Sequence, residues 1–93
     1  TGVRRVGSIE LMREKFSRHA LRQIKERNLT RAEVLRIVRS PQKVIQQTLD
    51  RYRAIQTVKK QNRRFLLVVI YDEVDSRRII VTAFLTTKFQ KYL

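Results

Sequence analysis

The stretch Phe65-Leu66-Leu67-Val68-Val69-Ile70-Tyr71 is almost wholly apolar. Such a run predicts a central strand that is covered on both sides, or nearly so. Short polar segments flank it at 60–63 and 72–76, and neither is long enough for a parallel crossover connection. We therefore expect antiparallel neighbours on both sides: an alternating strand over 52–59 and a last long strand over 79–85.

Two helices are predicted before these strands. Ser17 is a good N-cap, and Ala20, Leu21 and Ile24 follow it at helical spacing, which indicates a short helix that ends near Asn28. Thr30 and Glu33 form a capping-box pattern that opens a second helix. This helix ends before Ser40-Pro41, because proline disfavours a helical residue before it.

The expected fold is α+β, with two N-terminal helices packed on one face of a three- to four-stranded antiparallel sheet. A short additional strand near Val44 and Ile45 accounts for the range in strand number. We expect residues 1–8 to be a flexible lead-in and residues 9–93 to form a single domain. The segment 9–16 is compatible with a helical turn or with a short strand.

Composition limits the chemistry of the protein. The chain has no cysteine and one histidine, which excludes thiolate and histidine-rich metal sites, and we expect neither a metal nor another cofactor. No apolar run is long enough to span a bilayer and no signal-peptide pattern is present, so we expect a cytoplasmic protein that does not bind membranes. The net charge of +14 predicts a polyanionic partner, nucleic acid first.

His19 is the candidate general acid or base. It lies in the first turn of the first predicted helix, where the helix dipole favours anions and the neutral imidazole, which suits a base. A phosphate docked beside it would favour the imidazolium, which suits an acid. RNA cleavage needs both roles, so Tyr92, Lys88 or Lys59 would have to carry the second proton. The alternative is that His19 is a half-exposed surface residue without a role.

Basic and hydroxyl side chains on the strands are candidate phosphate ligands. Arg53 and Lys59 share one face of the alternating strand, and with Arg51 and Arg63 they would form a phosphate cradle or simply a solvated face. Thr86 is either a donor to a phosphate oxygen or an ordinary strand-edge threonine.

Two other chemistries are rejected. The carboxylates at 72, 73 and 75 are the expected content of a hairpin turn rather than a magnesium site. The only glycines are Gly2 and Gly7, so no phosphate-binding loop exists.

Four sequence features together resemble a widespread uncharacterised bacterial small-domain family. They are Ser17-Arg18-His19-Ala20, the Asn28-Leu29-Thr30 helix start, Ser40-Pro41, and the tail Thr86-Thr87-Lys88-Phe89-Gln90-Lys91-Tyr92. That family is similar to the RelE-like and BrnT-like toxins and, more distantly, to the colicin D group of metal-independent ribonucleases. Phe84 and Thr87 depart mildly from its pattern, in which tyrosine and serine are common.

The resemblance implies two helices on a four-stranded antiparallel sheet, as in RelE and the barnase- and colicin-like ribonucleases. It also implies an active cleft and an acidic antitoxin as protein partner, which suits the charge. Carried over by position, the catalytic candidates are His19, Arg53, Thr86, Lys88 and Tyr92. The candidate RNA-binding residues are Arg18, Arg22, Arg51, Lys59 and Arg63.

We therefore predict a metal-independent endoribonuclease toxin of a toxin–antitoxin-like system, which binds RNA and cleaves it by general acid/base chemistry. The first alternative is a non-catalytic nucleic-acid-binding module. In that case the two helices could form a DNA-binding helix-turn-helix. A third alternative is an interaction domain whose charge serves a protein partner.

Overall fold

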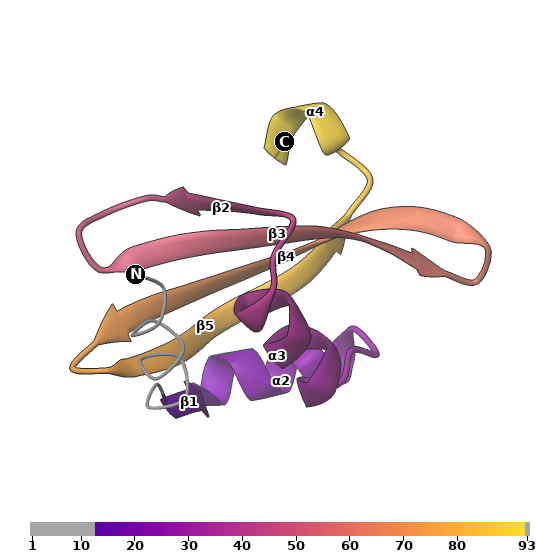
Figure 1. Cartoon of the computed structure of the whole chain (residues 1–93). Helices are drawn as coiled ribbons and strands as arrows, with labels where there is room; N and C mark the ends of the chain where they lie inside the picture. Colours follow the sequence, from indigo (N-terminus) through magenta and orange to yellow (C-terminus); the bar gives the residue numbers. More distant parts are fainter. Residues whose placement is uncertain (1–12, 93) are drawn as a thin grey trace.

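Residues 13–92 are described by the structure, a computed structural model (Figure 1). The expected lead-in over residues 1–8 lies outside the described residues. The elements in chain order are β1 (Arg13–Phe16), α2 (Arg18–Glu26), α3 (Arg31–Arg39), β2 (Lys43–Gln46), β3 (Arg51–Lys60), β4 (Arg63–Val74), β5 (Arg77–Thr86) and α4 (Phe89–Tyr92). None of the described helices has the length and apolar character needed to span a membrane.

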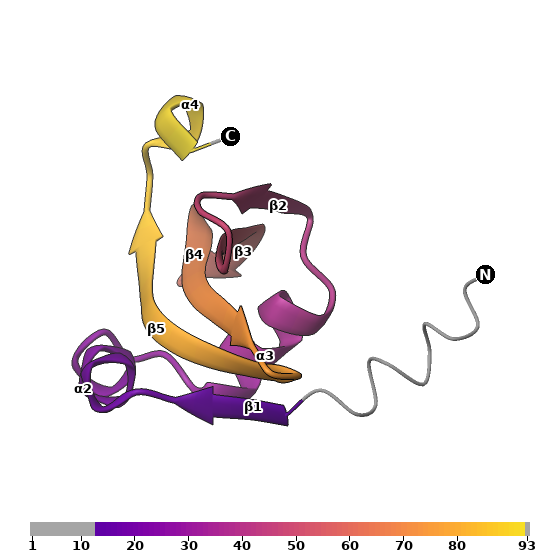
Figure 2. The same cartoon turned by 90° about the vertical axis from the view of Figure 1, so that its left-hand side faces the viewer.

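The predicted three- to four-stranded antiparallel sheet is wrong. The sheet has five strands in the order β1-β5-β4-β3-β2, and it is mixed because β1 runs parallel to β5. Figure 2 shows β1 lying beside β5 at the edge of the sheet. Arg13–Phe16 contains only four residues, and so short a segment has no periodicity that separates a strand from a helical turn.

A third helix, α4, was also absent from the expected fold. It follows β5 and lies on the opposite side of the sheet from α2 and α3 (Figure 1). At four residues it is too short for an amphipathic period to be detected in sequence.

The apolar run does form the central strand, as predicted. Leu66, Leu67, Val68 and Val69 of β4 are fully buried although they alternate between the two faces of the sheet. On one face, which we call the helix face, Leu67 and Val69 pack in the cluster that includes the helix residues Ala20, Ile24, Val34, Ile37 and Val38. On the other, which we call the tail face, Leu66 and Val68 pack with Ile55 and with Ile45, Phe84, Phe89 and Tyr92.

The helix termini follow the predicted caps. The Ser17 hydroxyl accepts a hydrogen bond from the Ala20 amide (3.0 Å) and donates one to the Val81 carbonyl of β5 (3.2 Å). The capping box is confirmed, because Thr30 and Glu33 each accept a bond from the other's backbone amide. The first cap thus fixes α2 to the sheet as well as beginning the helix.

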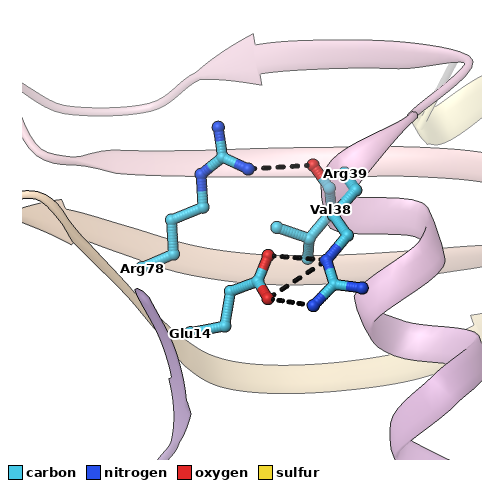
Figure 3. Close-up of polar contacts among 4 residues, drawn as sticks. All are labelled: Glu14, Val38, Arg39 and Arg78. Carbon is cyan, nitrogen blue, oxygen red and sulfur yellow. Dashed lines mark hydrogen bonds and ion pairs between the residues drawn. The ribbon is translucent and has the colours of Figure 1, made fainter. Parts of the chain in front are cut away.

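The edge strand β1 is joined to α3 by an ion pair. Arg39, at the end of α3, contacts the carboxylate of Glu14 with its Nε and Nη2 at 2.6–3.1 Å (Figure 3). In the same region Arg78 of β5 donates to the Val38 carbonyl at 3.5 Å (Figure 3). These contacts connect the parallel edge of the sheet to the helical layer.

Both long hairpins turn through two residues in the left-handed region. Gln61 and Asn62 have φ of 52° and 64°, and Asp75 and Ser76 have φ of 51° and 62°. Two consecutive positive φ values are typical of the tight turns whose twist matches that of antiparallel strands. The second turn is therefore shorter than the predicted segment 72–76, and the carboxylates at 72 and 73 belong to β4.

Because β4 is buried on both faces, replacing one of its leucines by alanine should destabilise the protein more than the same substitution at an exposed leucine elsewhere in the chain. Leu67→Ala should lower the free energy of unfolding by about 2–5 kcal/mol, because it leaves a cavity under the helices. Leu49→Ala, at a side chain that is 84% exposed, should change it by less than about 0.5 kcal/mol. Urea unfolding of both variants measures the difference. Equal effects would show that β4 is not the core.

Candidate functional site

Arg53 lies in a row of side chains that crosses the tail face. It is directly opposite Ile70 of β4, and Ile70 is directly opposite Thr82 of β5. Directly opposed residues of antiparallel strands project from the same face, so all three side chains lie on the tail face. The row leads from β3 across the sheet to the side where α2 is attached.

Helix α2 continues this row beyond β5. The Thr82 hydroxyl is hydrogen-bonded to the Gln23 side-chain oxygen. Along the same strand, the Ser17 amide donates to the Ile80 carbonyl (2.9 Å) and Arg27 Nη1 donates to the Ala83 carbonyl (3.0 Å). These three bonds hold α2 alongside β5, and α2 directly follows β1 in the chain (Figure 2).

His19 is placed beside this row by the helical repeat. It precedes Gln23 by four residues, and residues four apart are neighbours on a helix surface. The His19 side chain is exposed, and the structure gives it no hydrogen-bond partner among residues 13–92. Arg18 and Arg22 are exposed on the same helix. The predicted histidine is thus accessible at one end of a row whose other end is Arg53.

The Arg53 guanidinium is held under an aromatic ring. Its Cζ lies 5.5 Å from the ring centroid of Tyr92, and that ring packs edge-on against Phe84 with 5.6 Å between centroids. Arg53 Nε is buried and has no hydrogen-bond partner among the described residues. A buried donor without an acceptor is costly, and an anionic oxygen would satisfy it well. Two predicted site residues, Arg53 and Tyr92, are therefore in contact.

Thr86 and Lys88 do not take part in the contact between Arg53 and Tyr92. Thr86 follows Thr82 by four residues, which is about 14 Å along β5. Its hydroxyl accepts the Lys88 amide at 3.0 Å, so it stabilises the turn into α4. Lys88 is exposed in that turn. The structure therefore separates the hydroxyl and lysine of the tail from the row that begins at Arg53.

The predicted RNA-binding residues on the strands divide between two faces. Lys59 is exposed and shares the tail face with Arg53, by alternation along β3. Arg63 is opposite Lys60, whose ammonium pairs with Glu33 of α3 at 2.6 Å, and therefore lies on the helix face. Sequence reasoning missed Arg64, which is opposite Lys59 on the tail face with its Cζ 5.8 Å from the Phe89 ring centroid.

Arg51 is engaged by a carboxylate rather than free for a phosphate. Its Nε and Nη2 donate to the two oxygens of Asp72 at 2.7 and 3.0 Å. The next acidic residue of β4, Glu73, accepts from Arg78 Nε at 3.1 Å. Each of these carboxylates thus has an arginine partner on a neighbouring strand. Among the described residues, no group of three or more side chains is placed to hold a metal ion.

Three pockets of the described surface are lined by residues outside this row, and one of them, of about 470 Å³, is lined by Thr87, Lys88, Phe89, Gln90 and Lys91. Another, of about 410 Å³, lies between α3 and β3 and is lined by Arg36, Ser40, Thr57 and Lys59, among others. A third, of about 450 Å³, lies where Arg27 and the β3–β4 turn meet.

A family model described as a domain of unknown function, DUF4258, matches residues 16–85. No match to a curated protein or to a solved structure was found. The matched stretch contains His19, Arg53 and Thr82, and it ends before Thr86 and α4. The expected similarity to RelE-like and colicin-type proteins is not supported by a match.

The Arg51–Asp72 pair predicts a pH dependence of stability. The hydrogen bond from Arg51 lowers the pKa of Asp72 from its ordinary value of 3.8. A lowered pKa stabilises the folded state above about pH 4, and this contribution is lost as the pH falls through the folded-state pKa. Asp72→Asn should therefore be less stable than wild type at neutral pH, and the gap should close as the pH falls below 4.

Chemical unfolding over a pH series measures this gap. Asp75→Asn is the matched control, because Asp75 is exposed in the β4–β5 turn and has no arginine partner among residues 13–92. A gap for Asp72→Asn that is independent of pH would contradict the assignment.

Proposed function

This chain belongs to the DUF4258 family, and we propose that it is a metal-independent endoribonuclease that cleaves RNA on the tail face. The observation that carries the proposal is the buried Arg53 Nε, which has no partner among the residues that the structure describes and lies under Tyr92 in the row that leads to the helix of His19. A positive group with an unused donor is what a phosphate oxygen needs. The row that contains this guanidinium leads to the helix that carries the only histidine of the chain.

The chemistry follows from the groups in this row. RNA cleavage without a metal requires a base that takes the 2′-hydroxyl proton, an acid that protonates the leaving 5′-oxygen, and positive charge at the phosphorane. In this proposal His19 moves one proton and the Arg53 guanidinium stabilises the charge. The phenol of Tyr92, in contact with Arg53, is the nearest candidate for the second proton.

The row is wide enough to hold a length of RNA. Two strand spacings separate β3 from β5, which is about 10 Å, and α2 lies beyond β5. For one phosphate to contact both groups, the long side chain of Arg53 and the exposed imidazole of His19 must reach towards each other from the two ends of the row. The surface is also strongly positive overall, since the chain carries a charge of +14. That charge accelerates association with a polyanion.

The proposed biological role is that of a toxin. It rests on the sequence resemblance and on the excess of basic residues, which suits an acidic antitoxin. Such a partner would compete with RNA for the same cations. Binding to an acidic protein should therefore inhibit cleavage, and this inhibition should weaken as the salt concentration rises.

One observation favours the alternative of a non-catalytic nucleic-acid-binding module. Among residues 13–92, no side chain orients the His19 imidazole, whereas a catalytic base commonly has such a group. Catalytic hydrogen bonds often tighten only when substrate binds, so the exposed imidazole is compatible with both functions. In the alternative, RNA binds through Arg53 and the surrounding cations without being cleaved.

Removal of the imidazole separates the two functions. His19→Ala should lower the rate of RNA cleavage in EDTA by about 10²–10⁴-fold, the usual contribution of a general acid or base. RNA affinity and unfolding temperature should be nearly unchanged, because the side chain is exposed. Cleavage at the wild-type rate by His19→Ala would contradict the proposal. Binding without cleavage by the wild type would support the non-catalytic module.

A further inference from the structure

The end of the β3–β4 hairpin extends beyond the rest of the sheet. Pairing of β2 with β3 stops at Ile55, and pairing of β5 with β4 stops at Leu66. Residues 56–60 and 63–65 therefore form a two-stranded segment, which we call the ribbon, without a third strand on either side. Figure 1 shows this hairpin projecting past its neighbours. Gln61 and Asn62 close it with positive φ values.

The ribbon carries like charges directly opposite one another. Lys59 is opposite Arg64, and Lys60 is opposite Arg63. Like charges in directly opposed positions destabilise a pair of strands. The second pair is partly compensated on the helix face, where Lys60 contacts Glu33 of α3 at 2.6 Å.

The first pair is not compensated by any carboxylate that the structure describes. Lys59 is exposed, and Arg64 contacts the Phe89 ring through its guanidinium without an acidic partner in residues 13–92. A hairpin selected only for stability would place opposite charges at these positions. An external polyanion that lies against the tail face of the ribbon would compensate this pair of like charges.

The chemistry of the ribbon favours nucleic acid over a protein as that polyanion. Four of the six residues at 59–64 are Lys or Arg, and the other two are Gln61 and Asn62. The exposed large apolar side chains of the described chain lie elsewhere, at Val44, Leu49 and Val74. A specific protein interface needs an apolar core, whereas a phosphodiester backbone needs only cations and polar donors.

We propose that the ribbon is an arm that binds the phosphodiester backbone of RNA outside the cleavage row, with Lys59 and Arg64 as its phosphate ligands. Both share the tail face with Arg53, and Lys59 lies about 20 Å from Arg53 along β3. One RNA molecule can thus contact the arm and the row together. The inference rests on the proposed function only in its choice of RNA, because the arm binds whether or not His19 catalyses cleavage.

Two charge reversals test the arm. Lys59→Glu removes one phosphate ligand and creates an opposite-charge pair with Arg64. The matched control is Arg77→Glu, which makes the same change of charge and creates an opposite-charge pair with Arg13 at the far end of the sheet. Both variants should have unfolding temperatures at low salt equal to or above that of the wild type.

RNA binding should separate the two variants. The probe is a short 2′-O-methyl RNA, which lacks the attacking hydroxyl, offered as a single strand and as a duplex over a series of salt concentrations. Lys59→Glu should bind several-fold more weakly, and the slope of log affinity against log salt should fall by about one. Arg77→Glu should keep the wild-type slope. The form of RNA that shows the larger loss is the one that the arm holds.

Two outcomes would overturn the arm. Equal losses in Lys59→Glu and Arg77→Glu would show that only net charge matters, and no loss in either would show that Lys59 contacts no phosphate. Failure of the proposed catalysis is distinguishable from both. In that case the wild type cleaves no unmodified RNA, while Lys59→Glu still weakens binding of the modified RNA.

Discussion

The structure depends on the burial of β4 on both of its faces. An apolar strand in the middle of a sheet must be covered twice, and in this chain the two covers differ. Helices α2 and α3 cover the helix face with a continuous apolar layer. The tail face has a smaller cluster, closed by side chains of β2 and β5 and by the short helix α4. Because this second cover is partial, polar groups such as Arg53 reach the surface next to the core.

The proposed function follows from this asymmetry. Arg53 is half-buried and lies under Tyr92 of α4, and its Nε has no acceptor among residues 13–92. Other arginines are paired with carboxylates, as Arg51 is with Asp72 and Arg39 is with Glu14. Three cations that have no carboxylate partner within the described part of the chain, Arg53 in the row and Lys59 with Arg64 in the ribbon, share the tail face. A bound RNA backbone would compensate all three.

Sequence reasoning succeeded where one strong local pattern acts alone. The run Phe65-Leu66-Leu67-Val68-Val69-Ile70-Tyr71 and the Thr30/Glu33 capping box each determine their own element. It failed for the parallel strand Arg13–Phe16, which depends on pairing with β5 at the other end of the chain, and for α4, which is held by tertiary packing. For the candidate site, alternation correctly predicted that Arg53 and Lys59 share one face of β3. Arg64 was missed because its place opposite Lys59 depends on the register set by a two-residue turn.

The central claim is that the tail-face row from Arg53 to the helix of His19 binds the RNA backbone. Its most direct test is an NMR titration of the isotope-labelled protein with a short 2′-O-methyl RNA, following the Arg53 side-chain Nε–H and the His19 ring signals. The account predicts that both shift with the same dissociation constant, and that the exchange of the Arg53 Nε–H slows as it gains an acceptor. Shifts confined to helix-face residues, with Arg53 and His19 unchanged, would contradict it.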